Sequence, residues 1–565
     1  MNRQETLQHY KENPEVSVLI VGAGVNGVGT FRDLALQGVD VLLVDRGDFC
    51  SGASAASSHM VHGGIRYLEN GEFRLVREAV QERNHLIQNA PHYVKPLLTV
   101  IPVFKWFSGI FNAPLKFIGM LTKPSERGAI IIKIGLIMYD AFTRKQGTVP
   151  KHQFKPRGVT LGEFPKINPK IRFTARYYDG AMHTPERICA EMLLDGEAAY
   201  KNANALNYVS LERASGNTVT LKEEITGESF VVRPQVLINA AGPWIDFANE
   251  KIGFQTQFIG GTKGSHLILN NPELRAAIGE NEFFFENKDG RIVLIYPMKD
   301  KVMVGTSDLP IENPDDVHCT DAEIDYFFEM VPLVFPNIHL SREQIVFQFS
   351  GVRPLPKADV NNPGQISRDH SIRVTEPDDG LDFPIYSLVG GKWTSFRAFS
   401  EEVADKSLEL LNLSRKVSTR DLAIGGGRDY PKTVVAQEKW RGTLANKTKI
   451  PAERIYELFE RYGTRSQPIA EYISQGIDTL IKSLPGYSQR EIEFIVQKEK
   501  VIHLDDFFIR RSMVAKLGQL SSSNLDEIAN IIGNYLKWSD IQRNQEIQRT
   551  HQVLVEMHGI VLERE

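Results

Sequence analysis

The chain has 565 residues, 42% of them hydrophobic, and a formal net charge of −4 at pH 7. This length favours two or three domains, and the near-neutral charge argues against a generally basic nucleic-acid binder. The three cysteines have no CxxC spacing, so neither a zinc ribbon nor a disulfide scaffold is indicated and no metal site is expected. The polar first residues do not resemble a secretory signal, and no apolar run of about 18 residues predicts a membrane-spanning helix.

The first predicted elements form a β-α-β unit. A strand over residues 16–21 runs into a helix that begins near Val25, and a second strand over residues 39–44 ends on Asp45. The glycines at the first turn have GxGxxG spacing: Gly22, Gly24 and Gly27. Such glycines allow a sharp turn and close approach to a pyrophosphate, and the acid about 20 residues on accepts hydrogen bonds from ribose hydroxyls. The unit predicts dinucleotide binding, without separating NAD from FAD; the alternative is a tight turn.

The rest of the chain changes character several times. The first 15 residues predict a loose arm or a short helix, residues 72–90 an amphipathic helix, and residues 97–104 a strand. Residues 257–350 hold several β-like runs without regular helical interruption. Beyond a glycine run at residues 425–427, which we interpret as a linker, charged helical segments follow at 452–462, 489–498 and 525–535.

Three further segments carry small residues where a backbone can approach a ligand. Residues 51–64 form a hydroxyl-rich loop that includes Ser57, Ser58, Gly63 and Gly64. One apolar strand ends in Asn239-Ala-Ala-Gly242-Pro-Trp244, and another runs into Gly390-Gly391-Lys392-Trp393-Thr394. A helix cap and an ordinary strand exit are the alternatives for the first two. Because the third segment would return to the cofactor from its other end, it favours FAD and redox chemistry.

Two arginines indicate an anionic ligand. Arg353 lies on a stiff backbone in Ser-Gly-Val-Arg-Pro, and Arg368 follows in Ile-Ser-Arg-Asp-His. A guanidinium group binds phosphate or carboxylate through two hydrogen bonds. A surface salt bridge is the alternative for each.

These segments together carry a resemblance to a known family. The order is Gly-Ala-Gly-Val-Asn-Gly, Ser-Ser-x-x-x-His-Gly-Gly-Ile-Arg-Tyr-Leu-Glu, Asn-Ala-Ala-Gly-Pro-Trp, Lys-Gly-Ser-His, Ser-Gly-Val-Arg-Pro-Leu and Gly-Gly-Lys-x-Thr. From about residue 16 to residue 412 the chain resembles the FAD-dependent glycerol-3-phosphate dehydrogenases of the D-amino-acid-oxidase-like flavoprotein superfamily. The region after residue 416 fits the helical extension of that family by position more than by motif.

The expected fold class is α/β, α+β overall, with three domains. These are a discontinuous Rossmann-like FAD-binding domain (16–95, 178–256 and 350–415), a β-rich substrate or cap domain (96–177 and 257–349) and a C-terminal helical domain (416–565). The resemblance implies that FAD is held by Gly22, Gly24, Gly27, Asp45, Ser57, Ser58, Gly63, Gly64, Gly242, Gly391, Lys392 and Thr394.

The resemblance also implies the reaction, oxidation of sn-glycerol 3-phosphate to dihydroxyacetone phosphate with transfer of the C2 hydride to N5 of the flavin. The implied substrate-binding residues are Arg66, Tyr67, Arg353, Arg368 and His266. Arg353 and Lys392 are also implied in catalysis, since a cation at the flavin end stabilises negative charge.

Three histidines are candidates for the base. His62 is the leading one, because the ordinary pKa of imidazole suits proton transfer near neutral pH; the alternative is that it orders the flavin loop. His266 is second, with a structural role in a strand as its alternative. His59, third, stands where the family commonly has lysine.

The electron acceptor implied by the resemblance is membrane quinone, or oxygen in an oxidase that makes hydrogen peroxide. Residues 95–145 are apolar and punctuated by lysines, as in a monotopic membrane contact; the alternative is a buried cap core. The expected location is cytoplasmic, peripheral on the membrane face, and a homodimer is left open. Competing hypotheses are an amine or amino-acid oxidase of the same superfamily and a non-catalytic flavin-bearing module.

Overall fold

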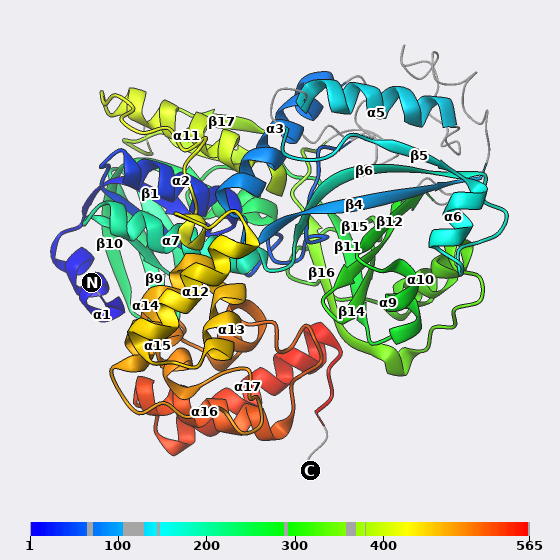
Figure 1. Ribbon diagram of the computed structural model, residues 1–565. Coiled ribbons are helices and arrows are strands. Elements are labelled where there is room, and N and C mark those ends of the chain that lie inside the picture. Colours follow the sequence, from blue (N-terminus) through cyan, green and yellow to red (C-terminus); the bar gives the residue numbers. More distant parts are fainter. Residues whose placement is uncertain are drawn as a thin grey trace.

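The computed structural model describes residues 2–64, 72–104, 129–143, 147–286, 292–357, 369–378 and 380–562. Two large sheets stand side by side, and helices of the last part of the chain pack beneath them (Figure 1). This confirms the expected fold class: a Rossmann-like α/β domain, a β-rich cap domain and a C-terminal helical domain. Within the ranges given above, no helix combines the length and apolar character needed to cross a membrane.

The first sheet is parallel at its centre and buried on both faces. Its path is β17 (Ser371–Thr375), β18 (Ile385–Val389), β10 (Ser229–Asn239), β1 (Glu15–Val21), β2 (Val41–Val44) and β7 (Ala203–Leu206). One face packs against α2 (Val25–Leu36), α7 (Pro185–Ala199) and α11 (Phe396–Leu410). The other packs against α1 (Arg3–Glu12), β8 (Val209–Ser215) and β9 (Thr218–Glu223). Strands covered on both sides are apolar at nearly every position, which explains the hydrophobic run Val18–Val21 at the end of β1.

The second sheet forms the cap domain. Its path is β15 (Leu309–Pro310), β11 (Thr262–Leu269), β14 (Lys301–Gly305), β13 (Ile292–Met298), β12 (Asn281–Glu286), β4 (Val94–Val103), β6 (Phe173–Met182) and β3 (Met60–Val61). Two more strands join it: β16 (Ile345–Arg353) pairs with β11, and β5 (Gln153–Pro156) with β6. The helices α3 (Phe73–Asn89) and α5 (Ala129–Thr143) pack over β6, and α5 lies across the top of the sheet in Figure 1.

Two helices of the cap domain correct the expectation that residues 257–350 lack helical interruption. They are α9 (Pro272–Ile278) and α10 (Asp321–Val334), and both pack against the face of the sheet opposite α5. The start of α10 is a capping box, in which Thr320 and Glu323 satisfy each other's backbone N–H groups. The Thr-x-x-Glu signal was present in the sequence, but the β-like runs around it dominated the pattern.

The strands cross two of the expected domain borders. β6 pairs with β4 along its whole length, so residues 178–182 lie in the cap sheet. β16 pairs with β11 as far as Arg353, beyond the border placed at 349/350. The short strand β3, from the hydroxyl-rich loop, also joins the cap sheet by pairing with β6. These strands therefore connect the FAD-binding and cap regions, and the exact domain borders stay a prediction.

The C-terminal helical domain contains helices at each expected segment. They are α12 (Val434–Thr448), α13 (Ala452–Tyr462), α14 (Ser466–Ser474), α15 (Gln489–Lys498), α16 (Ser522–Leu536) and α17 (Asp540–His558). The glycine run 425–427 is not the loose linker we expected, because all three glycines are buried. A Cβ on Gly426 would collide with the Tyr462 carbonyl oxygen, and one on Gly427 with that of Asn89. Glycine is therefore needed at this joint because backbones meet there.

A buried cluster of charges joins this helical domain to the first sheet. Asp48, four residues beyond the end of β2 at Val44, accepts hydrogen bonds from Arg510 Nε at 2.6 Å and from Arg511 Nη1 and Nη2 at 2.8 Å each. The Asp48 side chain is fully buried, and those of Arg511 and Arg510 are 1% and 10% exposed. Burial alone would raise the pKa of Asp48, but the two guanidinium groups hold it below its usual range.

Glu282 leads to a prediction about stability and pH. It is fully buried on β12, its Oε2 accepts a 2.7 Å hydrogen bond from Thr99, and burial raises its pKa from 4.5 to about 8. A raised pKa contributes stability that is complete below pH 4.5 and is lost as pH rises through about 8. Glutamine keeps the acceptor oxygen but cannot ionise. We therefore expect Glu282→Gln to abolish this pH dependence, in which the free energy of unfolding of the wild type falls by up to roughly 1.4 kcal/mol per pH unit.

The measurement for Glu282 is urea unfolding at several pH values between 5 and 9, compared with the wild type. The exposed neighbour Glu280, substituted as Glu280→Gln, is the matched control, since its side chain is 84% exposed. Unfolding midpoints that follow the same pH curve in wild type and Glu282→Gln would contradict the prediction.

Candidate functional site

A cavity of about 590 Å³ opens between the two sheets. It is lined by the carboxyl ends of β1, β10 and β18, by the hydroxyl-rich loop, and by β11 and β16 of the cap sheet. Open parallel sheets bind ligands at the carboxyl ends of their strands. The cavity brings together these residues named from the sequence: Gly22, Gly24, Asp45, Ser57, Ser58, His62, Gly242, His266, Arg353, Gly391, Lys392 and Thr394.

The glycine fingerprint has the geometry that its spacing predicts. Gly22 has φ +105°, and a Cβ there would lie 2.6 Å from the Ala240 carbonyl oxygen of the neighbouring strand. A Cβ on Gly27 would collide with the Gly22 carbonyl oxygen, so helix and strand can approach only without it. Gly24 is the N-cap of α2 and offers no side-chain cap. The positive end of the helix dipole therefore lies at the cavity wall, where an anionic pyrophosphate would be stabilised.

Asp45 both faces the cavity and braces the fingerprint turn. Its carboxylate accepts hydrogen bonds from the backbone N–H of Ala23 at 2.6 Å and of Gly47 at 2.9 Å. Burial raises its pKa to about 6. Contact of this carboxylate with a ribose stays a prediction, and the structure adds a structural role that the spacing did not indicate.

The second glycine pair turns the chain at the end of β18. Gly390 and Gly391 have φ +78° and +95°, in the region that favours glycine. Lys392 and Thr394 follow and line the cavity. The Thr394 hydroxyl accepts a 3.1 Å hydrogen bond from the His62 N–H and donates one of 2.9 Å to the His62 carbonyl. Residues more than 330 positions apart thus form one wall.

Arg353 is held in place by a short loop after β14. Its Nη2 donates to Thr306 Oγ1 at 2.8 Å and to the Ser307 carbonyl at 3.1 Å, and its Nη1 lies 3.1 Å from Asp308 Oδ1. Gly264 of β11 leaves room for the guanidinium, since a Cβ there would collide with it. The side chain stays 22% exposed and lines the cavity, so a cation is presented there in a fixed orientation.

His266 is buried beside Arg353. Its Nε2 lies 2.9 Å from Ser58 Oγ, and its ring stacks on Phe349 with centroids 4.9 Å apart. Burial, followed by the charge of Arg353, lowers the pKa of His266 to about 3. The imidazole is therefore neutral at physiological pH and suits hydrogen bonding to a substrate hydroxyl better than holding a proton.

Four other residues named from the sequence are not among those that line the cavity. His59 is fully buried behind the loop, with Nδ1 2.9 Å from the His183 carbonyl and Nε2 3.3 Å from that of Ala55. The other three are Gly27, Gly63 and Gly64. Arg66, Tyr67 and Arg368 lie outside the described residues, so their roles stay predictions.

Sequence reasoning missed the residues that support the site from the cap domain. Glu323 accepts hydrogen bonds from Ser265 Oγ at 2.8 Å and Ser307 Oγ at 2.5 Å, and so joins β11 to the loop that holds Arg353. Asp315 accepts a 2.8 Å hydrogen bond from Trp244 Nε1 and pairs with Arg46, which links the two domains at the cavity. No local spacing signals these contacts, because each partner comes from a distant segment.

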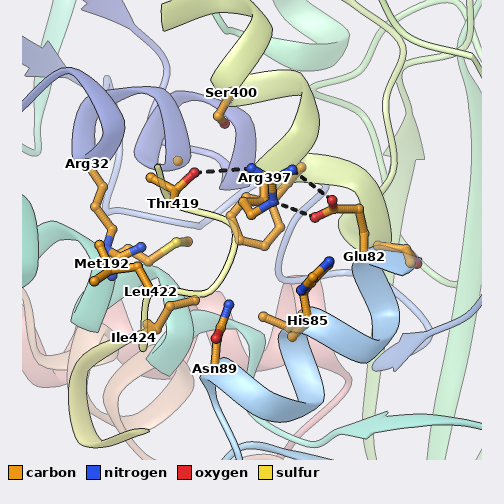
Figure 2. Close-up of a pocket in the computed structure, with 14 residues that line it drawn as sticks. Arg32, Glu82, His85, Asn89, Met192, Arg397, Ser400, Thr419, Leu422 and Ile424 are labelled. Atoms are coloured by element: carbon orange, nitrogen blue, oxygen red, sulfur yellow. Dashed lines mark hydrogen bonds and ion pairs between the residues drawn. The ribbon is translucent and has the colours of Figure 1, made fainter. Parts of the chain in front are cut away.

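A second, much smaller cavity of about 20 Å³ lies behind Thr394. Figure 2 shows Arg397 of α11 at its centre, joined to Glu82 of α3 and to Thr419. The ion pair has two 2.7 Å hydrogen bonds, from Nε and Nη2 to the carboxylate, and both side chains are at most 10% exposed. Such a buried fork fixes the start of α11, and with it the Thr394 segment, against α3.

These features fit FAD. Glycine turns with positive φ occur at two separate strand ends, Gly22 after β1 and Gly391 after β18, and both line the same cavity as the N-terminus of α2. A Cβ at Gly22 would collide with the Ala240 backbone, so the first of these turns requires glycine. A dinucleotide with pyrophosphate at the helix and its ring system at the second turn matches this placement.

Comparisons with known proteins agree with this fit. Residues 17–370 match the family model "FAD dependent oxidoreductase", and residues 417–543 match the "C-terminal domain of alpha-glycerophosphate oxidase". A glycerol-3-phosphate dehydrogenase of Synechocystis sp. is 32% identical, covering 96% of this chain and 97% of its own. A D-erythritol 1-phosphate dehydrogenase of Brucella abortus is 29% identical, covering 88% and 93%.

Among solved structures, the glycerol-3-phosphate dehydrogenase from Bacillus halodurans complexed with FAD superposes with a TM-score of 0.76. It is 20% identical in sequence and covers 100% of this chain and 99% of its own. The likeness extends through the C-terminal helical domain, so the fold is shared over the full length. The expected cofactor, FAD, is confirmed by the family.

Proposed function

The chain belongs to the FAD-dependent oxidoreductase family, and on that premise we propose that it oxidises sn-glycerol 3-phosphate at C2 to dihydroxyacetone phosphate. The observation that carries the proposal is one cavity in which the glycine fingerprint, Arg353, His62 and Lys392 meet. A fixed guanidinium suits a phosphorylated substrate, and nearly full-length similarity to glycerol-3-phosphate dehydrogenases supports the substrate class. FAD, when bound in this cavity, would supply the hydride acceptor.

Four residues of the cavity bind the substrate, accept its proton and stabilise negative charge. Arg353, held by Thr306 and Asp308, binds and orients the anionic substrate. His62 accepts the proton of the C2 hydroxyl, as its place on the cavity wall and the acid–base chemistry of imidazole indicate. Lys392 supplies positive charge where negative charge develops. His266, neutral beside Ser58, hydrogen-bonds a substrate oxygen.

We further propose that the electrons pass to quinone at a membrane surface. The support is α5, which exposes Ile134 (55%) and Ile137 (51%) beside Lys133, as expected for a helix lying at a lipid interface. Within the lysine-rich apolar segment named from the sequence, 95–145, residues 105–128 lie outside the described residues. Co-sedimentation with anionic vesicles tests the contact, and a homodimer stays a prediction.

The decisive experiment is anaerobic mixing of the purified yellow protein with sn-glycerol 3-phosphate while the visible flavin band is followed. We expect rapid bleaching, much slower bleaching by D-erythritol 1-phosphate, and none by glycerol or by amino acids, which lack the phosphate that Arg353 binds. Reoxidation by a soluble quinone under argon, faster than by air, would support the dehydrogenase over an oxidase. A flavin that stays oxidised with glycerol 3-phosphate would contradict the proposed substrate.

A further inference from the structure

The loop that carries His62 is anchored by two side chains that do not line the cavity. The backbone N–H of Gly63, the next residue, points away from the cavity wall to two buried side chains. It lies 2.9 Å from the Tyr139 hydroxyl of α5 and 3.2 Å from Asp179 Oδ1 of β6. Neither Tyr139 nor Asp179 lines the cavity. This pair therefore meets the loop from the cap domain.

The anchor is rigid because its members hold one another. The Tyr139 hydroxyl donates to Asp179, and Arg83 of α3 donates from Nη1 to the Tyr139 oxygen at 3.0 Å and to the Tyr178 carbonyl at 2.7 Å. Arg83, Tyr139 and Asp179 are 0%, 3% and 1% exposed. Gly63 is closely packed, since a Cβ there would collide with the Val80 side chain and the Tyr139 hydroxyl. Buried, mutually bonded polar groups of this kind specify one geometry.

The loop is thus fixed from two sides. Thr394, at the second glycine turn, holds the N–H and carbonyl of His62, while Tyr139 and Asp179 hold the N–H of Gly63. Two restraints on adjacent residues set the direction in which the His62 side chain leaves the backbone. Proton transfer requires a base within hydrogen-bond reach of the substrate hydroxyl, so a small error in this direction slows the step.

We propose that Tyr139 is a positioning residue for His62: through the Gly63 N–H, its hydroxyl sets the backbone from which the base reaches the substrate. The inference rests on the proposed function, since it assumes that His62 takes the hydroxyl proton. It also gives α5 a second role, because the helix that exposes Ile134 and Ile137 on its outer side contacts the catalytic loop from its inner side.

The test is Tyr139→Phe, which keeps the ring and removes the oxygen. The ring packing is retained, because Tyr139 meets Tyr177 edge to face at 5.6 Å and lies under the Arg83 guanidinium at 5.1 Å. We expect the limiting rate of flavin reduction by glycerol 3-phosphate to fall about tenfold or more, as misplacement of a reacting group predicts. The apparent substrate affinity, the FAD content and the unfolding midpoint should change little.

Tyr177→Phe is the matched control. Tyr177 is buried to the same degree as Tyr139, 3% exposed, and the substitution removes the same hydroxyl group. Tyr177 is not among the described partners of the Gly63 N–H, which are Tyr139 and Asp179. Equal reduction rates in the two variants would overturn the inference, and so would loss of FAD or a weakened fold in Tyr139→Phe alone. Failure of the wild type to be reduced by glycerol 3-phosphate would instead contradict the proposed function, so the two failures are distinguishable.

Discussion

Replacing Arg353 with alanine is expected to lower kcat/KM for glycerol 3-phosphate by about 10²- to 10³-fold, the range seen when one preorganised donor is removed from an active site. Its guanidinium is the charged group that the loop of Thr306, Ser307 and Asp308 holds at the cavity wall. Lysine should not rescue the variant, because an ammonium group cannot reproduce a two-pronged contact. Stopped-flow reduction at varied substrate concentration gives both the affinity and the limiting rate.

Arg342→Ala is the control for this prediction. Arg342 lies just before the start of β16, whose last residue is Arg353, and it pairs with Asp321 and Asp325 at the surface, 46% exposed. Its loss should leave reduction unchanged, and both variants should retain FAD because neither residue touches the fingerprint. If Arg353→Ala bound and oxidised the substrate as the wild type does, Arg353 would not be the anion clamp.

The largest effect on stability is expected from Arg511→Ala. Asp48 is fully buried, and Arg511 supplies two of its hydrogen bonds, so among the described residues the variant leaves the carboxylate with Arg510 and Asn207 as donors. Breaking a buried ion pair from one side costs about 3–5 kcal/mol. The midpoint of urea unfolding should fall accordingly. FAD should also bind more weakly, because Asp48 follows the turn that Asp45 braces.

Arg549→Ala provides the comparison for Arg511→Ala. Arg549 pairs with Asp505 in the same cluster, but its side chain is 38% exposed, so water can solvate the partner it leaves. A much smaller loss of stability is expected, in line with exposed ion pairs. Similar unfolding midpoints for the two variants would mean that the cluster does not anchor the helical domain to the cofactor loop.

Local patterns determined much of this protein. The spacing of Gly22, Gly24 and Gly27 predicted the turn, and at Gly27 the requirement for glycine arises within the β-α-β unit, from the Gly22 carbonyl oxygen. At Gly22 it arises from the backbone of Ala240, which only the fold brings close. The helices at 452–462 and 489–498 follow the apolar period of their own residues. Family motifs then indicated FAD and named Arg353, Lys392 and His62, which the fold brings to one cavity.

The tertiary structure decided the contacts between segments that lie far apart in the chain. Whether Gly63 faces a cofactor or a buried tyrosine depends on where α5 packs, and its own neighbours in sequence carry no sign of that. The glycine run at 425–427 looked like a linker because three glycines in a row suit free backbone, but here the backbones of Tyr462 and Asn89 exclude any Cβ. The pKa of His266 depends in the same way on burial and on Arg353, 87 residues away in the sequence. Local propensity and spacing act over a few residues, whereas burial and charge act between any residues that the fold brings close together, so the sequence alone indicated the site and only the packing decided how its residues are held.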